Sequence, residues 1–389
     1  MSSHLAAVLS AKGEDEALTV HRRPTPDPGP GELLIQVKSV ALNPADWKIR
    51  DSGLFIPSSA YPTVIGFDIA GLVLKVGRDV PITCFRPGVT RVAAYAASVW
   101  RSFGPDYGAF QERCLVPWQH AVPLPIAPGN RLMSWNEAAT LPVAAVTALN
   151  AWDVLSPNRS HYPTSPPLPR AIKKKKKGEA LLIWGASSSI GTMGVQFAAA
   201  QAQAQAQARV QVQDPDVAVP AAVYATASKA NHAYILSLGA DCVFDHDPDA
   251  IVTAARRDGL VIRRCFLATG ELAQCQRVLR AFAFEGEEEE EQEKAKIASA
   301  PPLPSSPDVS EEEEVVESIF VYPSTDEAER LRQFQYWLGT CLGRGLADGH
   351  VRPSPEPRVV GRGLHAINDG LKFLKKGVSC AKLVVEISD

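Results

Sequence analysis

Residues 181–194 read Leu-Leu-Ile-Trp-Gly-Ala-Ser-Ser-Ser-Ile-Gly-Thr-Met-Gly and predict a buried strand that runs through a turn of small residues into a helix. Backbone N–H groups at such a helix start face a pyrophosphate group. Gly185 permits the tight turn, and Gly191 lets the helix pack closely on the strand. The other phosphate-contacting residues that this pattern predicts are Ser187, Ser188, Ser189 and Ile190.

The surrounding sequence favours a ligand-binding turn, although a turn of small residues that binds nothing remains the alternative on local sequence. Ser188 stands where many such loops carry their middle glycine, so the loop is a variant whose serines add hydroxyl groups near the phosphate. Short apolar strands at 222–225 and 242–244 alternate with helical segments at 190–208, 231–238 and 248–257. This alternation predicts right-handed βαβ units and a doubly wound parallel sheet.

The end of the second strand indicates which nicotinamide cofactor binds. The segment 223–229 reads Val-Tyr-Ala-Thr-Ala-Ser-Lys and carries no carboxylate, whereas NAD-binding units of this type place Asp or Glu there to accept the ribose 2′-OH. Ser228 and Lys229 instead offer a hydroxyl and a cation, which suit a 2′-phosphate. The sequence therefore predicts NADPH. The alternative is that Ser228 and Lys229 only cap the following helix.

Length and composition indicate a globular protein with about two domains. The chain has 389 residues, of which 46% are hydrophobic and 21% charged, with a net charge of −3. These values indicate neither a nucleic-acid nor a membrane partner. Seven scattered cysteines favour a reducing compartment. The N-terminus has no targeting pattern, and no apolar run reaches the roughly 18 residues of a membrane span, so we expect a cytoplasmic protein.

Three low-complexity segments interrupt the second domain, near 156–178, 201–220 and 285–314. Their proline-rich, Gln-Ala and acidic compositions bury too little apolar surface to offset the entropy of ordering, so we expect disordered surface loops. Within the second segment, the Gln-Ala repeat at 201–208 is expected to extend a helix. The lysine run at 173–177 is interpreted as a solvated linker, with a nuclear-import signal as the alternative.

Ordered motifs extend over most of the chain outside these segments. They read Leu-Asn-Pro-Ala-Asp-Trp-Lys at 42–48, Gly-Phe-Asp-Ile-Ala-Gly-Leu-Val at 66–73, Leu-Pro-Val-Ala-Ala-Val-Thr-Ala at 141–148, Tyr-Ala-Thr-Ala-Ser-Lys-Ala-Asn-His at 224–232 and Lys-Leu-Val at 382–384. Together they resemble the zinc-independent medium-chain dehydrogenases/reductases, in particular the fungal trans-acting enoyl reductases and the quinone oxidoreductases. Several independent motifs in the same order make this resemblance far more specific than a glycine loop alone.

The resemblance implies an α/β protein with two domains. A GroES-like β-barrel catalytic domain at 1–135 is completed by 351–389, and a Rossmann-fold NADP-binding domain spans 136–350. The cofactor and active site are expected in the cleft between the domains, with Asn231 and His246 among the cofactor-binding residues. His246 replaces the family's usual Tyr. Cys380 replaces the usual Gly, and we expect this second replacement to be harmless. The stretch after Phe284 lacks the usual Gly-Gly and strand before its acidic insert, which puts the fifth strand of the sheet in doubt and predicts a distorted edge.

The residues at the family's zinc positions do not suit a metal. Zinc-dependent relatives need a Cys, a Gly-His-Glu and a further Cys or Asp, whereas the corresponding stretches here begin at Asn43 and read Gly66-Phe67-Asp68. Phe67 cannot bind zinc, and segment 93–113 lacks the four cysteines of the structural zinc lobe. Reduction of an activated C=C bond needs no metal, because hydrogen bonds can hold the developing enolate. We therefore expect no metal site.

Our mechanistic hypothesis is hydride transfer from NADPH to the β-carbon of an α,β-unsaturated carbonyl. Lys48 is the candidate contact to the enolate or the nicotinamide ribose, Thr147 the candidate contact to nicotinamide or substrate, and Asn43 and Asp46 are expected to shape the same cleft. The plainer interpretations are an inert surface position for Lys48, a bond from Thr147 to its own helix backbone, and an N-cap role for Asp46.

Three functions remain open on sequence. The leading one is an enoyl reductase acting on a small or carrier-bound enoyl substrate, with a polyketide synthase as the partner that the resemblance implies. The second is a quinone or alkenal oxidoreductase that acts on small free molecules. The third is a cofactor-binding protein with little catalysis. The first two share a fold and differ in the substrate groove.

Overall fold

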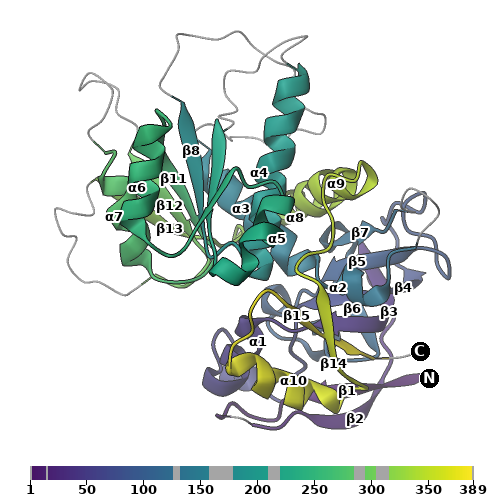
Figure 1. The fold of residues 1–389 in the computed structure, drawn as a ribbon. Coiled ribbons are helices and arrows are strands. Elements are labelled where there is room, and N and C mark those ends of the chain that lie inside the picture. The colour runs from purple at the N-terminus through teal and green to yellow at the C-terminus, as the bar shows by residue number, and fades with distance from the viewer. Residues whose placement is uncertain are drawn as a thin grey trace. The chain divides into compact units, whose positions relative to one another are not determined.

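The chain divides into two compact units. The structure is a computed structural model that describes residues 2–14, 16–125, 132–156, 178–208, 220–283, 294–303 and 315–387 (Figure 1). Unit 1 comprises residues 1–143 and 327–389, and unit 2 comprises residues 144–326. The expectations about 157–177, 209–219, 284–293 and 304–314 lie outside the described residues.

Unit 1 is built on a seven-stranded sheet with neighbours in the order β14-β15-β3-β4-β5-β7, in which β6 also pairs with β3. Apart from the parallel pair β14 and β15, the pairings are antiparallel. A separate hairpin joins β1 (Ser3–Val8) to β2 (Thr19–Pro24). The sheet strands are β3 (Glu32–Ala41), β4 (Asp68–Val76), β5 (Arg91–Tyr95), β6 (Arg113–Pro117), β7 (Ala121–Pro123), β14 (Pro357–Arg362) and β15 (Lys382–Glu386).

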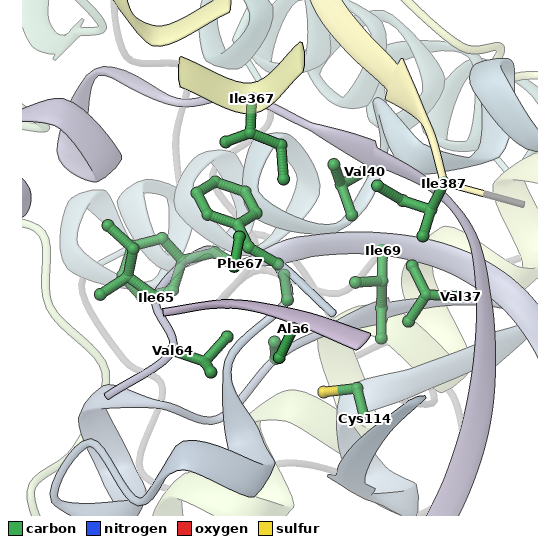
Figure 2. Close-up of a cluster of buried hydrophobic side chains, with 14 of the residues drawn as sticks. Ala6, Val37, Val40, Val64, Ile65, Phe67, Ile69, Cys114, Ile367 and Ile387 are labelled. Carbon is green, nitrogen blue, oxygen red and sulfur yellow. The ribbon is translucent and has the colours of Figure 1, made fainter. Parts of the chain in front are cut away.

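The two ends of the chain share one apolar core in unit 1. Figure 2 shows Ala6 from the N-terminal strand together with Ile367 from α10 and Ile387, which follows β15. Phe67 lies in the same cluster. Burial of this apolar surface is what couples the C-terminal segment to the N-terminal sheet. The helices of unit 1 are α1 (Pro44–Ser52), α2 (Trp135–Ala139), α8 (Glu327–Phe334), the π-helix η9 (Gln335–Leu342), α9 (Gly343–Ala347) and α10 (Ala366–Lys375).

Unit 2 is a six-stranded sheet in the order β10-β9-β8-β11-β12-β13, and every pairing is parallel. Numbered along the chain, the strands lie in the order 3-2-1-4-5-6, which is the order of a doubly wound nucleotide-binding sheet. The point at which the strand order reverses lies between the first and fourth strands. The strands are β8 (Glu179–Trp184), β9 (Ala222–Thr226), β10 (Cys242–Phe244), β11 (Val261–Leu267), β12 (Ala295–Ser299) and β13 (Val316–Phe320).

Helices cover both faces of the unit 2 sheet. In Figure 1, α6 (Pro248–Arg257) and α7 (Leu272–Arg280) lie on one side and α4 (Ser189–Ala208) on the other. α5 (His232–Ser237) packs near β10, and α3 (Pro142–Leu155) spans the division between the units. Gly194 of α4 sits against Ile183 and Phe266 of the sheet, where an added Cβ would lie 3.0 Å from the Phe266 ring. This close approach agrees with the small-residue start of the helix.

Two expectations about the low-complexity segments are wrong where the structure describes them. Residues 295–299, inside the predicted disordered segment 285–314, form β12, and Ile297 is fully buried between β11 and β13. The fifth strand is therefore present, because the short sequence Ala-Lys-Ile-Ala-Ser supplies enough apolar side chains for a strand buried in a parallel sheet. Residues 201–208 are helical as the end of α4, which confirms the helix extension but not disorder there.

One helical stretch is longer and more apolar than expected, since the sequence predicts no apolar run of roughly 18 residues. Among the described residues, 135–155 is long and apolar enough to cross a membrane by length and composition, and 78% of its apolar window is buried inside the structure. The stretch comprises α2 and α3, between which Pro142 starts a new helix. Burial of this extent is typical of a core helix in a soluble protein.

Candidate functional site: a glycine turn and a buried ion cluster

The turn after β8 has room only for glycine at two positions. Gly185 has a φ of 78°, and a Cβ added there would lie 2.5 Å from Thr269 Cγ2 and 2.6 Å from the Thr269 carbonyl oxygen. A Cβ on Gly191 would lie 2.4 Å from the Gly185 carbonyl oxygen. Any side chain at either position would displace backbone atoms. The turn is therefore a close-packed backbone cradle of the kind that approaches a pyrophosphate.

Ser188 holds this turn together from inside. Its hydroxyl donates to the Gly185 carbonyl oxygen over 2.8 Å and accepts from the Gly191 amide over 3.1 Å. The second bond caps the first turn of α4, as serine does at many helix starts. Because the single hydroxyl hydrogen is already used within the loop, Ser188 has no hydroxyl hydrogen left for a phosphate oxygen.

The start of α4 leaves backbone donors free. In the described part of the chain, neither the Ser189 amide nor the Ile190 amide donates to a backbone carbonyl, as expected for the first turn of a helix. These amides carry the positive end of the helix dipole. The side chains of Ser187, Ser189 and Ile190 are partly exposed. The predicted phosphate contacts therefore lie together on one accessible turn.

The end of β9 presents an exposed hydroxyl and an exposed cation. Ser228 and Lys229 are both exposed at the start of the short 3-10 turn η6 (Lys229–Asn231). The Ser228 side chain does not cap η6 and instead accepts a bond from Asn231 Nδ2 over 3.0 Å. The hydrogen bonds of Ser228 are therefore not those of a helix cap. Strand β9 also ends at Thr226, whose Oγ1 accepts from the Gly185 amide over 2.9 Å.

His246 lies beside the same edge of the sheet. It follows β10 and is exposed, and its ring meets Trp184 edge-on at 5.6 Å between ring centroids. Since β8, β9 and β10 are parallel neighbours, their carboxyl ends meet at one edge. The structure therefore brings together the predicted cofactor residues that follow these three strands.

The start of α1 in unit 1 is fixed by buried polar groups. Asn43 is the N-cap residue, and its backbone amide donates to Asp46 Oδ2 over 2.7 Å. Asp46 is therefore the reciprocal half of a capping box rather than the N-cap itself. The side-chain nitrogen of Asn43 bonds outside the helix, because Nδ2 donates to Asp68 Oδ2 over 2.9 Å. Asn43 is 4% exposed and Asp46 is fully buried.

Asp68 and Lys382 complete a buried ion cluster with Asn43. Lys382 Nζ lies 3.0 Å from Asp68 Oδ2 and donates to Asn43 Oδ1 over 2.5 Å. The other Asp68 oxygen accepts from the Val143 amide at the start of α3 over 2.7 Å. Lys382 is 3% exposed and Asp68 is fully buried. A buried ion pair persists only where such additional hydrogen bonds satisfy both charges, and these do so for Asp68.

Asp46 has an unusual charge state in this environment. Burial raises the pKa of the Asp46 carboxyl from 3.8 to about 8, and the neighbouring negative charge of Asp68 acts in the same direction. The Asn43 amide and Lys382 oppose the shift. Among the described residues, Asp46 Oδ1 has no hydrogen-bond partner. The carboxyl is therefore mostly protonated at neutral pH, which leaves the cluster with one negative and one positive charge.

Lys48 and Thr147 are accessible but lie outside this cluster. Lys48 is exposed on α1, with its Nζ 5.7 Å from the centroid of the Trp47 ring. Thr147 is partly exposed on α3, and no hydrogen bond of its side chain occurs within the described residues. The alternative of a bond to its own helix backbone therefore does not apply. Their catalytic roles stay predictions.

Sequence reasoning missed two members of the cluster. Asp68 belongs to the Gly-Phe-Asp motif at 66–73 and Lys382 to the Lys-Leu-Val motif, and the sequence assigns neither residue a role of its own. A signal was present in both cases, since each is a charged residue at the start of an apolar strand, β4 or β15. Charged residues at such positions are seldom fully buried unless they are paired.

The donor set at the family's zinc positions does not fit a metal ion. Phe67 has no ligand atom and packs in the apolar core of Figure 2. Asp68 is already neutralised by the ammonium of Lys382. Within the residues that the structure describes, no three His, Cys, Asp or Glu side chains gather in a metal-binding arrangement.

The sequence matches a known domain family and relatives of similar length. Residues 29–126 match the family described as alcohol dehydrogenase GroES-like domain. The chain is 36% identical over 389 residues to the trans-enoyl reductase tndF of Aspergillus flavipes, covering 99% of each chain. It is 31% identical over 396 residues to the dehydrogenase orsE of Emericella nidulans, covering 100% of both chains.

Solved structures of low sequence identity share the fold. An alcohol dehydrogenase superfamily protein from Novosphingobium aromaticivorans has a TM-score of 0.69 at 20% identity, covering 99% of this chain and 100% of that chain. The quinone oxidoreductase from Coxiella burnetii has a TM-score of 0.61 at 20% identity and covers 100% of both chains. These findings confirm the predicted GroES-like β-barrel and Rossmann-fold domains. With 36% identity over nearly its whole length to a trans-enoyl reductase, this oxidoreductase belongs to the fungal enoyl reductases of the medium-chain dehydrogenase/reductase superfamily.

Proposed function

We propose that the protein is an NADPH-dependent, zinc-independent reductase of activated C=C bonds in α,β-unsaturated carbonyl compounds. The observation that carries the proposal is the exposed Lys229 and Ser228 pair after β9, on the same sheet edge as the glycine turn. Trans-enoyl reductases among the relatives support the choice of an enoyl substrate. A carrier-bound acyl chain of a polyketide synthase is the proposed physiological substrate, and the cytoplasm is the proposed location.

The residues of unit 2 fit an NADPH molecule. The amides of Ser189 and Ile190 and the hydroxyls of Ser187 and Ser189 would bind the pyrophosphate. Lys229 and Ser228 would bind the 2′-phosphate through charge-assisted hydrogen bonds. Asn231 would orient the Ser228 hydroxyl, to which it already donates. His246 would lie on the adenine side, held by its edge contact with Trp184.

Polar residues of unit 1, together with Thr147 of α3 in unit 2, would supply substrate contacts and their support. When bound, NADPH supplies a hydride to the β-carbon, and negative charge develops on the substrate carbonyl oxygen. Lys48, exposed and cationic, would stabilise that oxygen electrostatically. Thr147 would donate a hydrogen bond to the nicotinamide or the substrate carbonyl. Asn43 and Asp46 are buried, so their proposed role is to hold the start of α1 rather than to line the substrate site. Water is the proposed proton donor to the α-carbon.

Two alternatives are separated by substrate tests. A quinone or alkenal oxidoreductase shares the fold of this chain, as the Coxiella burnetii structure illustrates, and would reduce small free substrates instead of enoyl thioesters. A cofactor-binding protein with little catalysis would bind NADPH without consuming it. We favour the enoyl reductase because relatives that carry this name cover nearly the whole chain.

The test is reduction of 2-enoyl thioesters by the purified full chain, with NADPH deuterated at C4. We expect saturated thioester carrying the label at the β-carbon, with quinones and simple alkenals reduced far more slowly. The matched variant Lys48→Met removes the cation but keeps most of the stem, and should lower kcat by about tenfold or more. Faster reduction of quinones than of every enoyl thioester would overturn the proposal, as would NADPH binding without any turnover.

A further inference from the structure

We propose that Lys382 is a positioning residue, whose ammonium, held by Asp68, fixes Asn43 and so the start of the helix α1 that carries Lys48. The proposal rests on the proposed function to the extent that Lys48 contacts the substrate. It concerns a residue 334 positions away from Lys48 in the sequence. The contacts that carry it lie within unit 1.

The amide group of Asn43 is held at both ends. Its oxygen accepts from Lys382 Nζ, while its nitrogen donates to Asp68 Oδ2 over 2.9 Å. The opposite orientation of the amide would set its NH₂ group against the ammonium and its oxygen against the carboxylate, which is unfavourable on both sides. The ion pair therefore selects one orientation of the Asn43 side chain.

The cluster joins segments that are distant in the sequence. Asn43 follows β3, Asp68 opens β4 and Lys382 opens β15. The backbone supports the same junction, because the Leu42 amide donates to the Leu383 carbonyl over 2.9 Å. The ammonium thus links the segments of Asn43 and Asp68, the two positions that correspond to metal-binding stretches in zinc-dependent relatives.

The position of Asn43 determines that of Lys48 through a short, stiff element. Lys48 lies five residues beyond Asn43, about one and a half helical turns. In the first turn the backbone amide of Asn43 donates to the Asp46 carboxyl group. In the last turn Ser52 Oγ donates to the Lys48 carbonyl over 2.7 Å. Lys375 of α10 holds the far end through Asp51 at 2.9 Å. Release at Asn43 would loosen the N-terminal end of α1, which the cluster restrains.

The test compares paired substitutions that keep the charge balance. Lys382→Met with Asp68→Asn removes both buried charges together, so neither is left unpaired. Asn43→Leu leaves the ion pair in place and cuts its link to α1, and serves as the second variant if the first does not fold. The control is Glu179→Gln with Arg264→Met, which removes a partly buried ion pair of 2.6 Å in unit 2.

Two readouts separate positioning from general stability. Hydrogen exchange of the peptide covering residues 44–52 should be at least about tenfold faster in both cluster variants and unchanged in the control. In the same variants kcat with an enoyl thioester should fall at least about tenfold while NADPH affinity stays within about twofold. Exchange and kcat both within about twofold of the wild type in either folded variant would overturn the proposal. A wild type without turnover would refute the proposed function, and the exchange data would still decide the role of Lys382.

Discussion

At the scale of single residues, Asp46 links the buried cluster to pH. The pKa of its carboxyl is raised to about 8 in the folded protein, mainly by burial, against 3.8 in the unfolded chain. Between these values the folded state keeps a proton that the unfolded state releases, so the stability contributed by Asp46 is full below about pH 4 and is lost as pH rises towards 8. Asp46→Asn mimics the protonated carboxyl and should remove this loss.

Chemical denaturation at a series of pH values measures the effect of Asp46. The free energy of unfolding of the wild type should fall relative to Asp46→Asn by up to about 1.4 kcal/mol per pH unit across this window. Asp348→Asn, which changes an exposed carboxylate, is the control and should track the wild type. A constant difference between wild type and Asp46→Asn at all pH values would show that Asp46 does not titrate in this range.

Cys380 is a strained residue that the sequence comparison treated as harmless. Its φ is 46°, in the left-handed region that favours glycine, and glycine is the residue expected there from the family pattern. We predict that Cys380→Gly raises the free energy of unfolding by about 1 kcal/mol, since relief of left-handed strain exceeds the entropy cost of glycine. Cys380→Ala keeps the Cβ and should not be stabilised. Equal stability of both variants would contradict the strain argument.

Lys229 tests the choice between the two nicotinamide cofactors. Removal of an exposed cation that pairs with a 2′-phosphate should weaken NADPH binding by about tenfold or more and leave NADH binding unchanged, because NADH lacks that phosphate. Fluorescence titration of Lys229→Ala with both cofactors measures this. Lys372→Ala removes an exposed cation on α10 and should change neither affinity. An equal loss for NADPH and NADH would place Lys229 elsewhere than at the 2′-phosphate.

At the scale of elements, the turn between β8 and α4 depends on backbone contact. A methyl group on Gly191 would meet the Gly185 oxygen at 2.4 Å and Ala186 Cα at 2.7 Å. Gly191→Ala should therefore destabilise the protein by about 1–3 kcal/mol and weaken NADPH binding. Gly339→Ala is the matched control, because the added Cβ would meet no atom within 4 Å apart from those of its chain neighbours and its own helix backbone. Unchanged NADPH affinity in Gly191→Ala would show that this turn does not hold the cofactor.

Strands were predictable where apolar runs were long and turns were marked. The β8 strand and the glycine turn follow from Leu181–Trp184 and Gly185, and β9 and β10 follow from similarly short apolar runs. The strand β12 was not predictable in the same way, because Ala295–Ser299 is flanked by acidic and proline-rich sequence and contains a lysine. Its order comes from pairing with β11 and β13 on both sides, a tertiary effect that local composition does not report.

The candidate site also has one part that follows from local sequence and one part that depends on tertiary contacts. Its phosphate turn is local in sequence, so the residues from Gly185 to Gly191 could be named from the pattern alone. The ion cluster is not local, because Asn43, Asp68 and Lys382 meet only when β15 pairs beside β3. A single sequence gives no register for that pairing. The burial of Asp46 likewise follows from packing that the motif at 42–48 does not specify.

For the whole molecule, most of the proposed cofactor contacts lie in unit 2, whereas the proposed contact of Lys48 and the ion cluster lie in unit 1. Unit 2 has the parallel sheet order and the turn that suit a dinucleotide. Unit 1 has the buried ion cluster and the exposed Lys48, and its core needs both chain ends. Cofactor binding and turnover should therefore respond to different sets of substitutions.

The most direct test of NADPH-dependent enoyl reduction is steady-state turnover of one enoyl thioester with NADPH and NADH in parallel, followed by loss of reduced-nicotinamide absorbance. We expect kcat/KM for NADPH to exceed that for NADH by about tenfold or more, in keeping with one charge-assisted contact. Equal values for the two cofactors would contradict the role of Ser228 and Lys229, and no turnover with either would contradict the proposed function.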